Sequence, residues 1–362
     1  MTDAWLDRLL VPAARRLPSN AEYLAHLSRG GQAGGAIRLA SNESTEPPSP
    51  RVRDALARAY LDANLSPSPA PPLRAALAAR HGTDADRVLL GAGSTEVIDA
   101  VLRAFVRAGD EVVLPAPSWP VFRRRLDALE ASVVEVPLTR GDDAWEYDVD
   151  ALLTAVSSRT KLLVVCSPNN PTGNALSAGD LRRCAAAGPL LLLDAAYAEF
   201  DGDALTPVAL ESERVVVTRT FSKAYCLAGL RLGYALGARD VIDHVDRFLV
   251  PGSSVSSATL HAGLAALDDE EHLARQVARI RGERVRLTAE LRRLGLTAFE
   301  SRGNFVAVET PVDAAAFAGA VREGGVVIRV MGPRLARITV GRSDENDVLL
   351  AAVAAALTPS RA

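Results

Sequence analysis

The chain has 362 residues, of which 48% are hydrophobic and 23% charged, and its formal net charge is −3. This composition excludes a mostly disordered protein, and the length suffices for two domains or one extended α/β unit. The charge gives no general attraction to nucleic acid or to an anionic membrane. No apolar run could span a membrane, and the first residues lack a signal pattern. The three cysteines lack metal-ligand spacing, so we expect a cytoplasmic protein without a bound metal.

The first two-thirds of the chain predict an α/β unit. A glycine-rich stretch at 30–35 predicts a flexible loop, and a proline-rich segment at 66–72 predicts a stiff extended connector. From about residue 85 to 240, short apolar runs alternate with amphipathic stretches, which predicts a mostly parallel sheet covered by helices on both faces. The predicted strands are 88–90, 111–115, 132–137, 162–166, 190–194, 215–218 and 232–235, and the predicted helices are 96–107, 121–129 and 178–187.

The last third of the chain has a different pattern. A serine-rich segment at 253–257 precedes a long helical pattern at 270–294. Strand-like runs at 305–308, 326–330 and 337–340 and a final helix at 344–357 complete the chain. We therefore expect a large domain at 46–250 and a smaller α+β domain at 251–362, with residues 1–45 forming an N-terminal arm and part of the small domain.

Lysine is rare in this chain, which has only Lys161 and Lys223 among its 41 basic residues. An amine can lose its proton and condense with an aldehyde, whereas a guanidinium cannot. Lys161 opens an apolar run and is typical of a surface lysine beside a strand. Lys223 follows the predicted strand 215–218, and it could be a solvated lysine or a reactive amine.

A carboxylate ends one of the apolar strands. Asp194 closes 190–194, at the edge where open α/β sheets bind ligands, and Tyr197 follows three residues later. The Asp194 carboxylate could cap the following turn or pair with a buried cation, for example a protonated pyridine nitrogen.

Two turns follow other strands. Gly91–Glu96 precedes a helix, where main-chain N–H groups could face one phosphate, although such a turn could simply cap the helix. Because Glu96 occupies the third glycine position, a dinucleotide fingerprint is excluded. Ser167–Gly173 predicts a rigid turn whose asparagine amide could also hold a phenolate or carboxylate oxygen.

Together these groups are the parts needed to hold pyridoxal phosphate. The chain resembles the class I/II aminotransferases of fold type I, and most closely the histidinol-phosphate aminotransferase group. The matching stretches, which run across nearly the whole chain, are Leu39–Glu43, Gly91–Glu96, Ser167–Gly173, Asp194–Phe200, Arg219–Tyr234, Asn304–Val306 and Arg337–Gly341.

The resemblance implies roles for individual residues. Lys223 would form the Schiff base and move the substrate's proton, while Asp194 would bind the pyridine nitrogen. The cofactor's 3-oxygen would contact Asn170 and Tyr197. The cofactor phosphate would contact Gly93, Ser94, Thr95, Ser222 and Arg231, the ring would stack on Trp119 unless that side chain only packs in the core, and the substrate would contact Asn170, Arg329 and Arg337.

The resemblance also implies a reaction and an assembly. A homodimer would move an amino group from an amino acid or amino-phosphate donor to a 2-oxo acid, as a biosynthetic enzyme. A decarboxylase of the threonine-phosphate decarboxylase type is the alternative on the same scaffold. A cofactor-binding regulator is disfavoured because only about 40 residues precede the matching region, too few for a winged helix and linker.

The chain departs from the family pattern on the substrate and subunit sides. Ser44–Pro47 replaces the usual segment after Ser-Asn-Glu, and Leu65 stands where the family has a tyrosine that reaches the neighbouring subunit's cofactor. The tyrosine that usually precedes Ala-Arg-Arg is also missing from Pro12–Arg16, and the Asp-Glu-Ala-Tyr motif has become Asp194–Tyr197 with alanine at its second position. The sequence therefore leaves the amino donor open.

Overall fold

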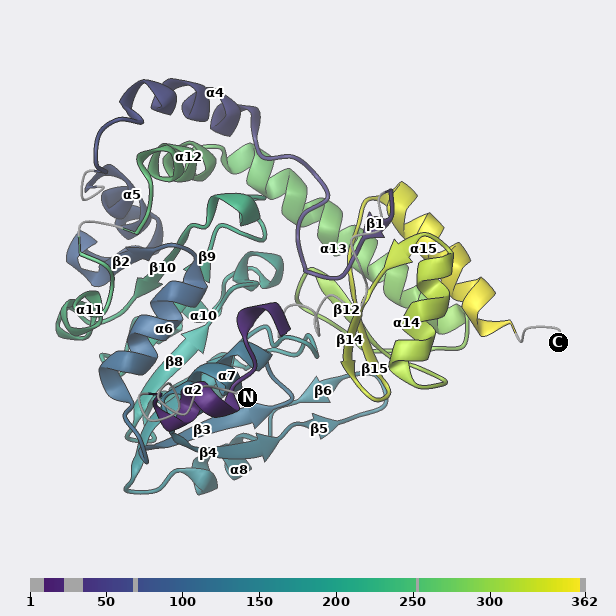
Figure 1. Ribbon diagram of the computed structural model, residues 1–362, viewed down its shortest axis with the longest axis horizontal. Coiled ribbons are helices and arrows are strands. Elements are labelled where there is room, and N and C mark those ends of the chain that lie inside the picture. Colours follow the sequence, from purple (N-terminus) through teal and green to yellow (C-terminus); the bar gives the residue numbers. More distant parts are fainter. Residues whose placement is uncertain (1–9, 23–34, 68–70, 252–253, 359–362) are drawn as a thin grey trace.

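The computed structural model describes residues 10–22, 35–67, 71–251 and 254–358. Its largest element is a seven-stranded sheet of order β2-β10-β9-β8-β7-β3-β4 (Figure 1). Strand β10 runs antiparallel to both of its neighbours, and the other neighbouring pairs are parallel, so the predicted mostly parallel sheet is confirmed. The strands are β2 (Val88–Gly91), β3 (Glu111–Ala116), β4 (Ser132–Pro137), β7 (Thr160–Cys166), β8 (Leu190–Asp194), β9 (Val215–Thr220) and β10 (Gly233–Leu236).

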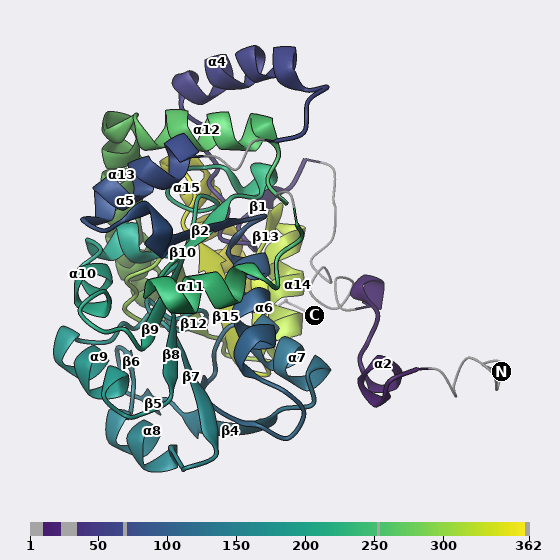
Figure 2. The ribbon, with the colours of Figure 1, turned by 90° about the vertical axis from the view of Figure 1, so that its left-hand side faces the viewer.

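Helices cover both faces of this sheet, as Figure 2 shows with the sheet between two helical layers. One layer contains α6 (Ser94–Phe105), α7 (Pro120–Ala128) and α11 (Arg239–Asp246), and the other contains α8 (Val149–Ala155), α9 (Ala178–Ala185) and α10 (Leu205–Ala209). Within β8, Leu192 packs in the first layer's core, while Leu191 and Leu193 pack in the second. Burial on both faces explains why this strand is apolar without alternation.

A second sheet lies towards the C-terminal end of the chain. It has the order β11-β12-β15-β14 and lies beside the long helix α13, which extends to it from the neighbourhood of α12 (Figure 1). Strand β1 pairs in parallel with β13, so the segment before residue 46 joins the C-terminal part. The elements are β1 (Ile37–Arg38), β11 (Thr297–Ala298), β12 (Phe305–Glu309), β13 (Val326–Val327), β14 (Arg329–Gly332), β15 (Leu335–Thr339), α13 (Glu270–Arg293), α14 (Ala314–Glu323) and α15 (Ser343–Leu357).

The remaining elements lie outside the two sheets and the helices that cover them. Helix α12 belongs to the predicted small domain, 251–362, but it packs against α4 and α5 of the predicted large domain. The domain boundaries therefore stay a prediction. No helix in the described ranges combines the length and apolar character that a membrane span requires. These remaining elements are α2 (Pro12–Arg16), α4 (Pro50–Ala59), α5 (Pro71–His81), α12 (Ser257–Leu267), the short strands β5 (Thr139–Arg140) and β6 (Trp145–Glu146), and the 3-10 turns η1 (Tyr60–Asp62), η2 (Ala85–Arg87), η3 (Ala198–Asp201) and η4 (Ala228–Leu230).

Two local predictions were wrong. The run 326–330 is not one strand, because Val326–Val327 pair with β1 whereas Arg329 begins a strand that pairs with β15. Residues 71 and 72 do not extend the proline-rich connector but begin α5, since the first helical turn tolerates proline. Residues 68–70 of that connector, residues 30–34 of the predicted loop and Ser253 lie outside the described residues.

One strand of the large sheet, β9, carries a buried arginine. Arg219 of β9 is 2% exposed, and its Nη2 lies 2.7 Å from Glu199 Oε1. Its Nη1 lies 2.6 Å from Asp203 Oδ2 and donates to Thr206 Oγ1 at 2.8 Å. These contacts tie β9 to the segment that follows β8. The guanidinium thereby compensates a buried carboxylate and a half-buried one.

We expect Arg219→Met to lower the free energy of unfolding by about 3–5 kcal/mol, because Glu199 would keep a buried charge without its counterion. Urea unfolding followed by circular dichroism measures the change. Arg182→Met is the matched control, since Arg182 and Glu211 form an exposed pair that contributes little. Equal shifts in the two variants would contradict the importance assigned to burial.

Candidate active site

A cavity of about 490 Å³ lies at the carboxyl ends of β7, β8 and β9. The segment Ser41–Glu43 and strands β14 and β15 contribute its other walls. Every predicted site residue except Gly93 lines this cavity, namely Ser94, Thr95, Trp119, Asn170, Asp194, Tyr197, Ser222, Lys223, Arg231, Arg329 and Arg337. The structure thus brings together residues from distant parts of the sequence, while the role of each stays a prediction.

Asp194 is a buried carboxylate, 4% exposed, at the end of β8. Its Oδ1 accepts a hydrogen bond from Thr218 Oγ1 at 3.3 Å, and its Oδ2 lies 3.7 Å from Cys166 Sγ. Burial raises the pKa of Asp194 to about 6, although these bonds, an Ala196 N–H and the Lys223 charge oppose the rise. Asp194 forms no ion pair among the described residues, so a cation entering the cavity could supply the missing countercharge.

Lys223 carries the amine of the cavity. Its Nζ donates to Ser41 O at 3.1 Å and lies 5.9 Å from the centre of the Tyr197 ring. Desolvation, together with the charges of Arg337 and Arg231, lowers the pKa of Lys223 to about 8, and the charges of Glu43 and Asp194 oppose this shift. The amine can therefore change protonation state close to neutral pH.

Glycines allow a close approach beside Arg231 and the start of α6. Gly93 precedes α6 with φ +84°, and a Cβ there would lie 2.4 Å from Arg231 Nη2. A Cβ on Gly233 would lie 2.1 Å from Ser94 N. Arg231 Nη1 also lies 3.5 Å from Ser222 Oγ. A guanidinium, hydroxyls and the first N–H groups of α6 thus converge in an arrangement suited to an anion.

Arg337 and Arg329 reach the cavity from the second sheet. Arg337 of β15 is 5% exposed, and it pairs in register with Arg329 of β14. Its Nη2 donates to Ala40 O at 2.6 Å, its Nη1 donates to Asn170 Oδ1, and its buried Nε has no hydrogen-bond partner. Burial, with a smaller effect of the Arg329 charge, lowers the pKa of Arg337 to about 10, and Tyr197 opposes this shift. A ligand oxyanion would stabilise the charged form.

Tyr197 and Trp119, which were both predicted to contact the cofactor, also contact other side chains of the protein. Tyr197 is 4% exposed, burial raises its pKa, and its Oη accepts a hydrogen bond from Asn170 Nδ2 at 3.3 Å. Trp119 lines the cavity and also packs edge-on against Phe122, with ring centres 5.2 Å apart. Core packing and contact with a ligand are therefore compatible for Trp119.

Sequence reasoning missed several residues of the site. Asn42 contacts Tyr197 Oη, Ser41 contacts Lys223, and Thr218 contacts Asp194. The stretch Leu39–Glu43 matched the family pattern, which was the available signal, but none of its residues was given a role. Asn42 is separated from Tyr197 by 155 positions, so no local pattern connects the two residues.

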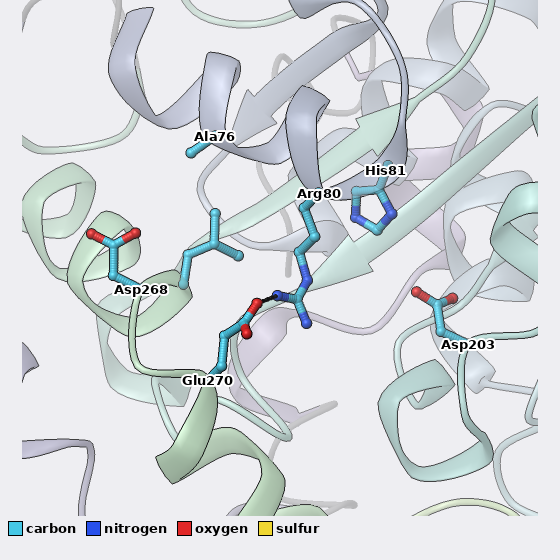
Figure 3. A pocket seen from close by; sticks show the side chains of 7 residues that line it. Ala76, Arg80, His81, Asp203, Asp268 and Glu270 are labelled. Carbon is cyan, nitrogen blue, oxygen red and sulfur yellow. Dashed lines mark hydrogen bonds and ion pairs between the residues drawn. The ribbon is translucent and has the colours of Figure 1, made fainter.

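A second cavity, of about 470 Å³, lies between α5, the start of α13 and Asp203 (Figure 3). Arg80 Nη1 and Glu270 Oε1 form an ion pair 3.4 Å apart on its wall. His81 also lines it, and its Nε2 lies 2.9 Å from Tyr234 Oη. No predicted site residue lines this cavity, so it is separate from the candidate active site.

We expect Lys223 to react with formaldehyde and cyanoborohydride with a midpoint near pH 8. Only the neutral amine reacts, and a pKa of about 8 makes the neutral fraction rise from about a tenth at pH 7 to about nine-tenths at pH 9. Mass spectrometry of the Lys223 peptide measures the reaction, with Lys161→Arg leaving Lys223 as the sole lysine. A midpoint at pH 10 or above would contradict the effect of desolvation.

Comparison with known proteins identifies the family. The pattern of the aminotransferase class I and II family matches residues 35–353. The chain is 38% identical over 331 residues to histidinol-phosphate aminotransferase 2 of Caulobacter vibrioides, covering 89% of this chain and 86% of that protein. It is also 38% identical over 326 residues to an aromatic amino acid aminotransferase of Mycobacterium tuberculosis, covering 87% of this chain and 91% of that protein.

Solved structures agree with this result. The histidinol-phosphate aminotransferase of Sinorhizobium meliloti, solved in complex with pyridoxal-5'-phosphate, superposes with a TM-score of 0.83 at 30% identity. The match covers 96% of this chain and 97% of that chain. The family resemblance of the sequence and the predicted fold class are therefore confirmed, and the chain belongs to the class I and II aminotransferases.

Proposed function

We propose that this chain is a pyridoxal-phosphate-dependent aminotransferase whose amino donor carries an anionic group. The observation that carries the proposal is one cavity lined by an amine, a buried carboxylate and the guanidinium groups of Arg231, Arg329 and Arg337. Family membership supports the reaction type, and the cavity supports the cofactor and the donor class.

The residues present fit the cofactor. Gly93 leaves the room that the Arg231 guanidinium occupies beside the start of α6, and Gly233 lets β10 approach the main chain of Gly93 and Ser94, so a Cβ at either position would disturb the phosphate cradle. The cofactor phosphate would contact Ser94, Thr95, Ser222 and Arg231. When bound, pyridoxal phosphate supplies an aldehyde that condenses with amines and a ring that accepts the electron pair of a broken Cα–H bond.

Asp194 would hold a proton on the pyridine nitrogen. Burial raises the pKa of this carboxyl to about 6, and a protonated ring nitrogen would favour its ionised form. Thr218 and Cys166 hold the two carboxylate oxygens in place. Asp194 would thus both orient the pyridine ring and compensate the charge of its protonated nitrogen.

Lys223 would move the proton of the reaction. With a pKa of about 8, its Nζ is protonated in part and neutral in part near neutral pH. A neutral amine would take a proton from the donor's α-carbon, and the resulting ammonium would return that proton to the cofactor's aldehyde carbon. The Ser41 carbonyl accepts a hydrogen bond from Nζ and keeps the amine beside the cavity.

Arg337 and Arg329 would bind the donor's carboxylate or phosphate. The Nε of Arg337 is buried without a partner, and Arg337 forms no ion pair among the described residues. Guanidinium groups bind carboxylate and phosphate oxygens through charge-assisted hydrogen bonds. The two arginines favour an amino acid or an amino phosphate over an uncharged amine.

We expect Lys223→Ala to slow the transfer of the amino group by at least about a thousandfold, because it removes the amine that moves the proton. Single-turnover absorbance of the cofactor-loaded protein with excess donor measures the rate. Lys161→Arg is the matched control, since Lys161 is exposed and does not line the cavity. A Lys223→Ala variant that retains the wild-type rate would contradict the proposal.

The same assay identifies the donor. Histidinol phosphate, phenylalanine and tyrosine are compared with an amine that lacks an anionic group, each with 2-oxoglutarate as acceptor. Turnover of the anionic donors alone supports the proposed donor class, and equal turnover of that amine would contradict it. Release of carbon dioxide without a keto product would instead establish the decarboxylase.

We also propose that the protein works as a homodimer in the cytoplasm. Three large apolar side chains, Tyr60, Leu61 and Leu65, are 79%, 77% and 60% exposed on one short segment after α4. Exposed apolar side chains grouped in this way are typical of an interface. The three cysteines form no disulfide, which suits a reducing compartment.

We expect the double substitution Leu61→Glu and Leu65→Glu to convert a dimer into a monomer, because two carboxylates would have to be buried at the interface. Sedimentation equilibrium at micromolar concentration measures the mass. Val285→Glu is the control, since Val285 is 69% exposed but belongs to a different helix, α13. A wild-type monomer, or a double variant that stays dimeric, would overturn the proposed interface.

A further inference from the structure

Asn42 forms hydrogen bonds through both its main chain and its side chain. It is 1% exposed, and its backbone has φ 52°, a left-handed conformation that asparagine tolerates better than most residues. Its N–H donates to Thr339 Oγ1 at 2.9 Å, and its main-chain oxygen accepts from Asn304 Nδ2 at 3.1 Å. These contacts fix Asn42 against the second sheet.

The side-chain amide of Asn42 points its donor at Tyr197. Thr339 Oγ1 donates to Asn42 Oδ1 at 3.1 Å, so the NH2 group is the end that faces Tyr197 Oη, also at 3.1 Å. Asn170 is oriented in the same way, because Arg337 donates to its Oδ1 and leaves its Nδ2 to face Tyr197 Oη at 3.3 Å. Each amide is therefore oriented by a neighbour outside the pair.

This arrangement determines what the tyrosine hydroxyl can do. A phenolic oxygen has two lone pairs and one proton, and here both lone pairs accept amide N–H groups. The proton is left to be donated to an acceptor in the cavity that Tyr197 lines. Two accepted hydrogen bonds also polarise the O–H bond and strengthen it as a donor.

We infer that Asn42 is a positioning residue that makes Tyr197 an obligate hydrogen-bond donor towards the cofactor's 3-oxygen. This inference rests on the proposed function, which supplies that acceptor. The neighbours of Asn42 contact the same site, since Ala40 O accepts from Arg337 and Ser41 O accepts from Lys223. The segment 40–42 thus binds three site residues with three consecutive positions.

The test is an absorbance titration of the bound cofactor against pH in Asn42→Gly. Glycine adopts φ 52° without strain, so this substitution removes the amide and keeps the backbone. We expect the midpoint to rise by about 0.5–1 pH unit, because the 3-oxyanion left after deprotonation would be held by a weaker donor. Asn42→Asp should give a larger rise, since its carboxylate would itself take the tyrosine proton.

Two further variants separate positioning from general destabilisation. Thr339→Val removes the hydroxyl that orients the amide, so the midpoint should rise by a smaller amount without any change at Asn42. Asn346→Ala is the matched control, because Asn346 is also fully buried but bonds to Gly341 and Glu283 instead of Tyr197. Its melting temperature should fall while the midpoint stays at the wild-type value.

The outcomes distinguish this inference from the proposed function. A wild-type protein that binds no pyridoxal phosphate would overturn the proposed function, and the inference with it. A cofactor-loaded Asn42→Gly protein with an unchanged midpoint would overturn the inference alone. If Asn42→Gly fails to fold, an unchanged midpoint in Thr339→Val overturns it instead.

Discussion

Opposite charges enclosed in one cavity, on Asp194 and Lys223, are the constraint on which the arrangement of the site depends. Burial favours the neutral form of each group, raising the pKa of Asp194 to about 6 and lowering that of Lys223 to about 8. Each charge partly stabilises the other across the cavity, yet the two form no direct ion pair. Titratable groups shifted towards neutral pH within a cavity are typical of functional sites.

The sheet's register provides the polar neighbours that such buried charge needs. Cys166, Asp194 and Thr218 lie side by side on β7, β8 and β9, and this places a thiol and a hydroxyl against the two carboxylate oxygens. The second sheet closes the cavity from the opposite side through Arg337 of β15. Behind β9, the buried Arg219 holds the segment that follows Tyr197. Topology therefore assembles the site from short local segments.

Much of the large sheet could be predicted from the sequence, because strands buried on both faces are short apolar runs between turns. Strands β4 and β8 have their predicted bounds of 132–137 and 190–194. Helix α12 was not predicted, since it is rich in alanine and glycine and lacks a clear polar face. The division of 326–330 between two sheets depends on pairing with β1, which lies almost 300 positions earlier.

The candidate site was predictable where polar residues end apolar strands, as Asp194 does, and where the family resemblance supplied a role. Asn42 was not predictable, because its importance arises from hydrogen bonds to Thr339 and Tyr197 across long sequence separations. Hydrogen-bond direction at Tyr197 likewise depends on how two amides are oriented, which only the assembled structure reveals.

The most direct test of the account is to locate the cofactor on the chain. The protein is incubated with pyridoxal phosphate, reduced with borohydride and digested, and the peptides are examined by mass spectrometry. Because the chain has only two lysines, the account predicts a stable cofactor adduct on Lys223 and an unmodified Lys161. An adduct on Lys161, or none on Lys223, would contradict it.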